Sequence, residues 1–508
     1  MANPLFDALF APLQARAPAL LVLPDHSEIT GRAFHTLIAR DASLLHALGV
    51  KPGDRIAAQI AKSPQALALY GASVALGAVF LPLNPAYTDA EVAYFLNDAT
   101  PKILVCDAAR KDGLANCTPA DCRVLTLNAD GTGSLTGAAS DAITAAPRLT
   151  LASRGPDDLA ALLYTSGTTG RSKGAMLTQN NLLSNAQTLA DLWQFTPADT
   201  LLHALPMFHT HGLFVATSVA LLTGAQIIFL PNFHPDTVLY HLPRATAMMG
   251  VPTFYTRLLE DPRFTRQACA HMRLFISGSA PLLAGTHRAF EARTGQKILE
   301  RYGMTETNMP TSHPYTGDRR AGTVGLPLPG VEVNITENGT ALPQGQVGMI
   351  EVRGPNVFKG YWNMPAKTRE DLRPNGFFIT GDLGRFDADG YLHIVGRQKD
   401  LIISGGFNIY PKEVELLLDA IPGVAESAVI GLPHPDFGEA VFAVLTAMPG
   451  VALDVDQVLA GLHGQLARFK HPKAAVVVGD LPRNAMGKVQ KTVLRAEFSG
   501  WFEGGGLQ

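Results

Sequence analysis

A run of small, hydroxyl and basic residues between two apolar segments has the chemistry of a phosphate-binding loop. Residues 159–164 form an apolar run that predicts a buried strand. The next ten residues, 165–174, offer backbone N–H groups, three glycines and two cations, which suit a polyphosphate. The order Ser172-Lys173-Gly174 excludes a Walker A loop, and a surface linker is the alternative. The residues assigned to phosphate binding are Thr165, Ser166, Gly167, Thr168, Thr169, Gly170 and Lys173.

A second chemically dense run ends an apolar stretch at residues 298–306. Within six residues it places a cation, an aromatic ring, a hydroxyl and a carboxylate, on Arg301, Tyr302, Thr305 and Glu306. A flat base can stack on Tyr302, Thr305 can donate to a phosphate oxygen, and Glu306 can hold Mg²⁺. On residue types alone, a polar strand end with a surface ion pair is the alternative.

Four further places in the chain have residue types suited to binding or catalysis. Asp382 lies between Gly381 and Gly384, where its carboxylate can accept hydrogen bonds from both hydroxyls of a ribose. The alternative is an Asp that only forms part of a β-hairpin turn. Arg397 follows shortly after. The pair Gly405-Gly406 allows the backbone to approach a ligand or another domain closely. Lys488 follows a glycine in a loop, where a solvated surface lysine is the ordinary interpretation.

The segment at residues 203–212 contains three histidines, His203, His209 and His211. No carboxylate or cysteine lies near them in sequence, and Pro206 and Gly212 argue against a regular strand, so a metal site is disfavoured. A histidine that lines an acid-binding pocket fits better.

A short glycine turn follows the strand predicted at residues 273–276. It contains Gly278, Ser279 and Ala280, and it lies where ligands bind in open α/β sheets, at the carboxyl end of a strand. A plain connecting turn is the alternative.

The elements that position these residues alternate between helix and strand over residues 1–160, which predicts a layered α/β fold with mostly parallel sheets. The uncharged stretches 66–83 and 212–231 are each interpreted as a core helix followed by a strand and not as membrane spans. Residues 128–140 read as a surface loop, and Thr178 caps a helix that runs to about residue 193. From residue 411 the pattern becomes a compact α+β unit, with helices predicted at residues 412–420 and 454–466.

The composition favours a large globular enzyme. The chain has 508 residues, 47% hydrophobic and 17% charged, enough for roughly three domain-sized units. A net charge of −3 gives no electrostatic argument for binding nucleic acid or a membrane surface. Four cysteines are too few for a disulfide framework, and the first residues lack a basic signal-peptide region, so a cytoplasmic location is expected.

Taken together, the loop at residues 162–176, the Tyr-Gly-Met-Thr-Glu run at 302–306 and the Gly-Lys loop at 487–488 resemble the motifs of the AMP-forming acyl-CoA ligases, the adenylate-forming superfamily. The matching motifs span residues 164–491 in the family's order. The resemblance implies an α/β fold with a large N-terminal adenylation domain, residues 1–398, of layered β-sheets and helices. It also implies a small α+β C-terminal lid domain, residues 399–508, with a hinge near Lys399.

The same resemblance implies a two-step reaction that uses ATP, Mg²⁺ and coenzyme A. A carboxylic acid first attacks ATP to give an acyl-adenylate and pyrophosphate, and the thiol of CoA then takes the acyl group and releases AMP. The implied catalytic residues are Lys488, Thr305 and Glu306, of which Glu306 places Mg²⁺. Gly278, Ser279, Ala280 and Tyr302 would frame adenine, Asp382 and Arg397 would bind the ribose, and Gly405 and Gly406 would line the tunnel for pantetheine.

Arg301 indicates the class of acid. Many ligases of this superfamily have a small residue before the Tyr, and a guanidinium buried there without a partner would be costly. A substrate with a second carboxylate would pair with it, helped by His209 or His211. The wording of residues 299–307 and 203–212 resembles the malonate-activating members of the family, which makes malonate the predicted acid and leaves methylmalonate open. A structural pair between Arg301 and Glu300, or another acid, is the alternative.

Other functions stay open at this stage. The chain could activate a medium-chain or aromatic acid, or load a carrier protein in place of CoA. A non-catalytic nucleotide-binding relative is disfavoured by the intact set of catalytic residue types. Lys488 lies in a loop that looks exposed, so a lysine acetyltransferase is a hypothetical partner that would remove its charge.

Overall fold

The computed structural model describes residues 2–141, 149–165, 172–405 and 407–502. The predicted phosphate-loop residues Ser166, Gly167, Thr168, Thr169 and Gly170, and the predicted tunnel residue Gly406, lie outside the described part. The fold is α/β: three sheets with their helices form a large N-terminal part, and a fourth sheet forms a small C-terminal unit, as the sequence predicted. None of the helices in the described ranges is both long and apolar enough to cross a bilayer.

The first two sheets contain the predicted parallel strands. The six-stranded sheet is parallel except for β8, and the nine-stranded sheet is parallel from β1 to β13 through its centre, with antiparallel strands at its edges. The first runs in the order β6 (Arg123–Thr126), β5 (Ile103–Cys106), β3 (Arg55–Gln59), β4 (Val79–Pro82), β7 (Leu159–Thr165) and β8 (Lys173–Thr178). The second runs β15 (Leu326–Pro327), β14 (Asn308–Ser312), β13 (Leu299–Met304), β12 (Leu274–Ser277), β11 (Ala247–Gly250), β9 (Thr200–His203), β10 (Gln226–Phe229), β1 (Ala19–Val22) and β2 (Glu28–Thr30).

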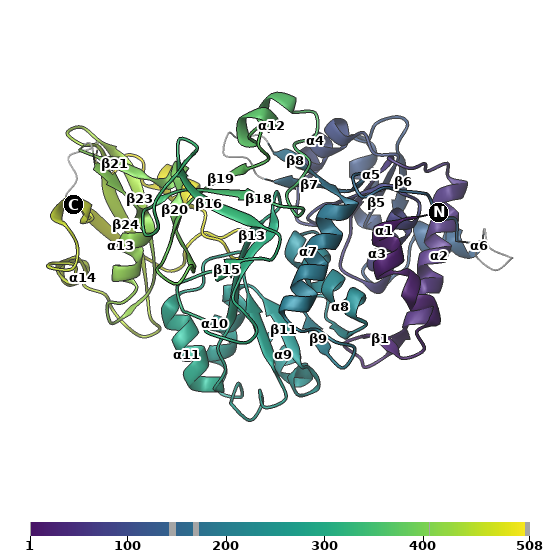
Figure 1. Cartoon of the computed structure of the whole chain (residues 1–508), viewed down its shortest axis with the longest axis horizontal. Helices are drawn as coiled ribbons and strands as arrows, with labels where there is room; N and C mark the ends of the chain where they lie inside the picture. Colours follow the sequence, from purple (N-terminus) through teal and green to yellow (C-terminus); the bar gives the residue numbers. More distant parts are fainter. Residues whose placement is uncertain (1, 142–148, 166–171, 406, 503–508) are drawn as a thin grey trace.

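The remaining sheets are largely antiparallel hairpins. The third sheet has the order β17 (Thr340–Ala341), β16 (Glu332–Glu337), β18 (Gly348–Arg353), β19 (Phe378–Phe386) and β20 (Leu392–Arg397). The fourth has β22 (Phe407–Ile409), β21 (Ile402–Ser404), β24 (Gly438–Ala447) and β23 (Val424–His434), with β25 (Ala474–Val478) parallel to β24. The chain passes from the third sheet to the fourth through the short 3₁₀ turn η5 (Gln398–Asp400). We call the part after this turn the lid, and Figure 1 shows it at the left of the view.

The helices begin where the sequence supplies caps. Thr178 caps α7 with a reciprocal capping box to Asn181, and Thr88 does the same for α4 with Glu91. In the N-terminal part the helices are α1 (Pro4–Leu9), α2 (Gly31–Ala47), α3 (Pro64–Ala75), α4 (Asp89–Ala99), α5 (Lys111–Ala115), α6 (Ser134–Asp141), α7 (Gln179–Leu192), α8 (Ser218–Thr223), α9 (Pro235–His241), α10 (Pro252–Glu260), α11 (Ala284–Thr294) and α12 (Pro365–Asp371), with short turns η1 (Ala11–Ala15), η2 (Ala108–Arg110), η3 (His211–Thr217) and η4 (Leu242–Arg244). The lid has α13 (Pro411–Leu418), α14 (Val455–Ala460), η6 (Arg468–Lys470) and α15 (Lys491–Glu497).

Both uncharged stretches are core elements, as predicted. Residues Ala66 to Ala75 of α3 are all buried, and β4 follows directly. Residues 211–223 form η3, which is a turn of π-helix, and α8, which ends at Gly224 in the left-handed conformation before β10. Two local expectations were wrong: the second half of the predicted surface loop at 128–140 is helix α6, and the helix predicted at 454–466 ends at residue 460.

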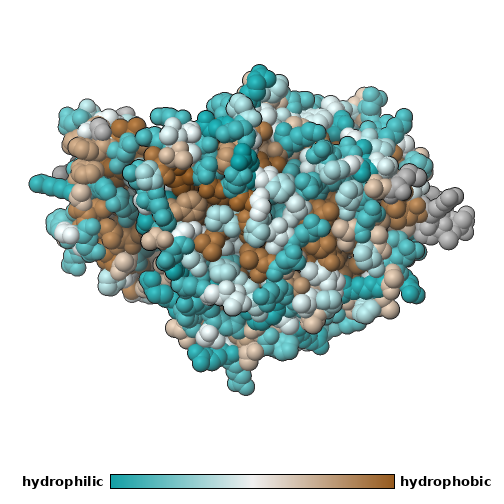
Figure 2. All heavy atoms as spheres, viewed as in Figure 1, coloured by the Kyte–Doolittle hydropathy of each residue, from teal (hydrophilic) through white to brown (hydrophobic). Residues whose placement is uncertain are grey.

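The lid carries much of the exposed apolar surface. Ile403, Phe407, Phe437 and Phe469 are large hydrophobic side chains that are exposed by 38–55%. Figure 2 shows hydrophobic residues gathered at the left of the view, where the lid lies. Within the lid, the rings of Phe407 and Phe469 lie 4.6 Å apart, and Phe437 contacts His434 at 4.7 Å.

Candidate active site

The turn between β13 and β14 places the Tyr-Gly-Met-Thr-Glu run. Arg301 and Tyr302 lie on β13, and Thr305 and Glu306 lie in the three-residue turn that leads to β14. A side chain at Gly303 would meet the carbonyl oxygen of Asn308 at 2.2 Å, so glycine is required for the turn to close. Asn308 takes the left-handed conformation, with φ of 46°, which Asn tolerates better than most residues.

Glu306 is a buried carboxylate without an ion pair among the described residues. Its Oε1 accepts hydrogen bonds from the Tyr361 hydroxyl at 3.1 Å and the Thr165 hydroxyl at 3.4 Å. Burial raises the pKa of Glu306, because the charged form has lost water. A carboxylate oxygen in this state fits a hard cation such as Mg²⁺, which would supply the missing charge.

Lys173 lies beside Glu306 at the start of β8. Its amine lies 4.2 Å from the centre of the Tyr361 ring, donates to the Tyr361 hydroxyl at 3.2 Å and lies 3.5 Å from Asp371. Tyr361 therefore connects Lys173, at the end of the predicted phosphate loop, with Glu306, the candidate Mg²⁺ ligand. Sequence reasoning missed Tyr361 and Asp371, because only the fold brings them beside Lys173: Tyr361 forms an isolated bridge with Ala175 of β8, and Asp371 ends α12.

Asp382 connects the predicted base and ribose residues. The Tyr302 hydroxyl donates to one Asp382 oxygen at 2.6 Å, and Arg397 Nε lies 2.8 Å from the other. Asp382 and Arg397 are paired residues of β19 and β20, so the sheet register brings them together. Burial and the Asp382 carboxylate raise the pKa of Tyr302, and the same carboxylate raises the pKa of Arg397. The carboxylate keeps free lone pairs for two ribose hydroxyls.

The glycine turn after β12 lies against Arg301. A side chain at Gly278 would lie 2.4 Å from the central guanidinium carbon of Arg301. The Ser279 hydroxyl lies 3.5 Å from Arg301 Nη2 and 3.2 Å from His211 Nδ1, and Ser279 itself has a φ of 73°. The structure therefore brings together Arg301, His211 and the turn at 278–280.

Arg301 is buried and has no carboxylate partner among the described residues. It is 3% exposed, and its Nε has no hydrogen-bond partner, nor does Nε2 of His211. Burial lowers the pKa of Arg301 to about 9. Burial and the Arg301 charge lower the pKa of His209 to about 4, so this histidine is neutral near pH 7. The proposed pair with Glu300 is absent, since Glu300 lies instead 3.3 Å from His287 Nδ1.

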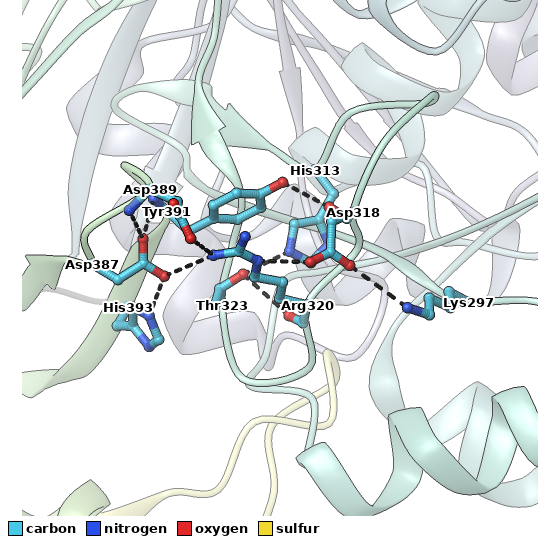
Figure 3. Close-up of polar contacts among 9 residues, drawn as sticks. All are labelled: Lys297, His313, Asp318, Arg320, Thr323, Asp387, Asp389, Tyr391 and His393. Carbon is cyan, nitrogen blue, oxygen red and sulfur yellow. Dashed lines mark hydrogen bonds and ion pairs between the residues drawn. The ribbon is translucent and has the colours of Figure 1, made fainter.

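A polar network contacts β13 at the backbone of Glu300, and Figure 3 shows the other members of this network. The backbone N–H of Glu300 donates to His313 Nδ1 at 3.1 Å, and the other ring nitrogen of His313 lies 2.7 Å from the Thr323 hydroxyl. Thr323 donates to the carbonyl of Arg320, whose guanidinium lies 4.2 Å from the centre of the Tyr391 ring. The remaining members shown are Lys297, Asp318, Asp387, Asp389 and His393. Strand β13 is thereby connected to the β19–β20 hairpin.

Lys488 is half-buried and lies close enough to Arg397, Asp382 and Asp400 for their charges to act on it. Burial, with the Arg397 charge, lowers the pKa of Lys488 to about 8. The preceding loop is docked on the N-terminal part: Met486 is 6% exposed and belongs to its main hydrophobic cluster. A side chain at Gly487 would lie 3.0 Å from Thr253 of α10.

The predicted hinge and tunnel residues lie at the entrance of the lid. Lys399 is exposed in η5, and the neighbouring Asp400 forms an ion pair of 2.7 Å with Arg495 of α15. Gly405 has a φ of 56° and its N–H donates to the Phe437 carbonyl at 2.9 Å. The hinge and tunnel roles of these residues remain predictions.

Comparison with protein families gives two matches along the chain. The sequence profile of the family described as AMP-binding enzyme matches residues 11–362, and that of the AMP-binding enzyme C-terminal domain matches residues 413–488. The first profile covers the two larger sheets and the strands β16 to β18 of the third sheet, and the second covers most of the lid.

Similar solved structures and curated relatives include enzymes that act on small diacids. The crystal structure of ATP-bound MatB from Rhodopseudomonas palustris is 56% identical, covers 99% of this chain and 100% of its own, and has a TM-score of 0.96; the apo form of MatB has a TM-score of 0.85. A malonate–CoA ligase of Arabidopsis thaliana is 38% identical over 67% of this chain and 60% of its own. A sulfoacetate–CoA ligase of Cupriavidus necator is 34% identical over 96% of this chain and 97% of its own. The chain spans about three-fifths of the length of the hop and Arabidopsis relatives that it matches.

Proposed function

This chain belongs to the AMP-binding enzyme family, the adenylate-forming acid–thiol ligases, and from this premise we propose that it converts malonate, ATP and CoA to malonyl-CoA, AMP and pyrophosphate. The single observation that carries the choice of acid is Arg301, a buried guanidinium with no acid partner in the described chain. The second carboxylate of malonate would form a bidentate pair with this guanidinium.

Two relatives support an acid with a second anionic group. The Arabidopsis relative is a malonate–CoA ligase. The Cupriavidus relative acts on sulfoacetate, which also has an anion at each end. An arginine with one unused N–H and a neutral histidine beside it suits either kind of second anion.

In the first step the reacting carboxylate must approach the negatively charged α-phosphate of ATP, so neutralisation and positioning dominate the barrier. Lys488 would lie between the two anions, while Lys173 and the loop from Thr165 would hold the outer phosphates. Thr305 would donate to a phosphate oxygen, and Asp382 with Arg397 would hold the ribose beside Tyr302. When bound at Glu306, Mg²⁺ would supply positive charge to the phosphates.

In the second step CoA must reach the acyl-adenylate, so Lys488 has to leave. We propose that the lid turns about Lys399 and that the strand pair at Gly405 and Gly406 then lines the path of pantetheine. The exposed hydrophobic side chains Ile403, Phe407 and Phe437 lie on the two strands and the loop around these glycines. In the second arrangement this surface would contact the N-terminal part.

Pyrophosphate release with ATP and Mg²⁺, with and without CoA, tests the proposal. The acids to compare are malonate, methylmalonate, oxalate, sulfoacetate, acetate, butyrate, octanoate and ferulate. We expect the highest kcat/KM for malonate, with one CoA consumed per AMP formed.

The other functions give different results in the same assay. A preference for octanoate or ferulate would leave the family and the two steps intact, and would return Arg301 to a structural role. Adenylation of malonate without consumption of free CoA would indicate that a carrier protein accepts the acyl group.

We also propose that Lys488 is a substrate for a lysine acetyltransferase, since acetylation would remove the charge used in the first step. Lys488 is half-buried with the lid docked, so ATP should protect it from acetylation. Mass spectrometry of Lys488 after incubation with an acetyl donor and acetyltransferase, with and without ATP, measures this. Equal modification in both samples would contradict the protection.

A further inference from the structure

A buried lysine amine bridges the first two sheets next to the acid-binding wall. Lys62 lies in the connection between β3 and α3, and its Nζ lies 2.8 Å from His203 Nδ1, 2.8 Å from the His203 carbonyl and 3.0 Å from the Leu205 carbonyl. Its amine also lies 4.4 Å from the centre of the Phe229 ring. No carboxylate pairs with Lys62 in the described ranges. Three acceptors surround the amine, enough to use every N–H donor that a lysine amine can have, so no donor is left for a ligand.

The contacts of Lys62 fix the tautomer of His203. Because Nδ1 accepts from the amine, Nε2 carries the ring proton and donates to the Gly212 carbonyl at 3.0 Å. The Thr217 hydroxyl donates to the same carbonyl at 2.9 Å and lies 3.1 Å from His203 Nε2. His203 and Thr217 are both fully buried, so these bonds have no competition from water.

The hydrogen bonds of His203 and Thr217 meet the π-helical turn η3 at the carbonyl of Gly212. Gly212 is its second residue, and a side chain there would lie 1.9 Å from the Pro206 carbonyl, so the two backbone segments touch. π-Helical turns frequently occur at functional sites. His211, the first residue of η3, lies 3.2 Å from Ser279, which lies 3.5 Å from Arg301. An unbroken series of contacts therefore runs from Lys62 through His203, Gly212 and His211 to Arg301.

We propose that Lys62, acting through His203 and Thr217, is a positioning residue that sets His211 against Arg301 and thereby the affinity for the acid substrate. The identification of that acid as malonate rests on the proposed function above. Lys62 itself does not touch the acid, since its donors are used by His203 and Leu205. Its removal should therefore act on binding of the acid and not on binding of ATP.

The test uses three variants of the full chain. Lys62→Met keeps the length of the side chain without its donors, Thr217→Val removes a hydroxyl at equal size, and Thr217→Ser keeps it. We expect Lys62→Met and Thr217→Val to raise the KM for malonate by about tenfold or more, with the KM for ATP changed by less than about twofold. Thr217→Ser should restore the KM for malonate close to that of the wild type. Lys359→Met is the matched control, because Lys359 is exposed and donates to a single carbonyl, that of Asp157.

Other outcomes would overturn the proposal. An unchanged KM for malonate in Thr217→Val, or equal increases in KM for malonate and ATP together with a lowered melting temperature, would show a purely structural role. If Lys62→Met does not fold, the Thr217→Val and Thr217→Ser pair decides by itself. If the wild type prefers a monocarboxylic acid, the proposed function fails, and the KM for that acid then decides whether the network positions the pocket.

Discussion

At the scale of the residue, the charge on Arg301 is the most informative feature of the site. A buried charge without a partner is costly, so its persistence indicates a ligand that neutralises it. We predict that Arg301→Met lowers kcat/KM for malonate by roughly 30-fold to several-thousand-fold, the equivalent of about 2–5 kcal/mol, because the second carboxylate would be left unpaired. Steady-state pyrophosphate release at varied malonate measures this.

The control for Arg301→Met is Arg263→Met, since Arg263 forms exposed ion pairs with Asp236 and Asp261 away from the site. This control should leave kcat/KM for malonate unchanged. In Arg301→Met the kcat/KM for acetate should fall little, because acetate has no second carboxylate. A normal rate with malonate in Arg301→Met would end the diacid assignment.

A second prediction concerns the charge of Lys488. Its pKa of about 8 lies below that of an ordinary lysine, so the cation is present below pH 8 and is lost as the pH rises through this value. Because the first step needs the cation, kcat/KM for malonyl-adenylate formation should fall above about pH 8. Transfer of preformed malonyl-adenylate to CoA does not need Lys488 and should lack this decline. A pH profile of each half-reaction, with Lys488→Ala as reference, distinguishes the two, and the same decline in both would contradict the assigned role.

The sequence predicted the acidic and basic residues of the site better than the residues that support them. Glu306, Asp382 and Arg397 could be recognised from short runs whose residue types suit a nucleotide, although their roles still await experiment. Tyr361 and Lys62 could not be recognised, because each lies in an ordinary-looking segment far along the chain from its contacts. Only the fold brings these donors to their acceptors.

At the scale of the element, the residue that follows β12, Gly278, must lack a side chain because Arg301 of β13 lies against it. A methyl group at Gly278 would lie 2.4 Å from the Arg301 guanidinium, too close for any pair of unbonded atoms. We predict that Gly278→Ala raises the KM for malonate by about tenfold or more, since the guanidinium must move. Kinetics at saturating ATP measure the effect.

The matched control for Gly278→Ala is Gly285→Ala in α11. Nothing lies within 4 Å of a side chain added there. Alanine in a helix should stabilise the protein by roughly 0.5–1 kcal/mol relative to glycine, with unchanged kinetics. An equal KM for malonate in both variants would show that Arg301 does not need the space at Gly278.

Elements with strong local signals could be predicted, and elements defined by tertiary packing could not. Helix α7 begins at the cap given by Thr178, and α3 was recognisable as a core helix because it combines a proline start with an unbroken apolar run. Helix α6 was taken for a loop, because the run at residues 128–140 that contains it is polar and glycine-rich, and this weak local preference was overridden by the fold. The π-helical form of η3 could not be foreseen, because its contacts, such as that of His203 with the Gly212 carbonyl, come from segments that only the fold brings together.

At the scale of the whole molecule, the docked lid holds Lys488 near Asp382 and Arg397, where we propose that the first step takes place. Met486 contributes to this arrangement by burial in the core of the N-terminal part. We predict that Met486→Ala weakens docking by about 2–3 kcal/mol and so lowers the rate of malonyl-adenylate formation. Transfer of malonyl-adenylate to CoA should be kept.

Single-turnover assays of each half-reaction test Met486→Ala. Met448→Ala is the control, because Met448 is 49% exposed on the same lid. Equal losses in both half-reactions would show that Met486 stabilises the lid itself and not its docking.

The division into a large part and a small lid at residue 399 was implied by the family resemblance, and the pattern of the sequence changes at residue 411. In the structure the third sheet ends at β20 and the fourth begins at β21, on either side of η5. Whether Lys399 is the hinge remains a prediction, since only one arrangement of the lid is described. The structure agrees more closely with ATP-bound MatB, at a TM-score of 0.96, than with the apo form of MatB, at 0.85.

The burial of Met486 also contributes to the free energy that is needed to undock the lid. If about 2 kcal/mol holds it in place, roughly one molecule in thirty has the lid undocked at any moment. A ligand that prefers the undocked arrangement by a factor of about a hundred would then reverse the balance. We therefore expect that the ligand present decides whether the lid is docked or undocked, and that no strong contact has to be broken between the two steps.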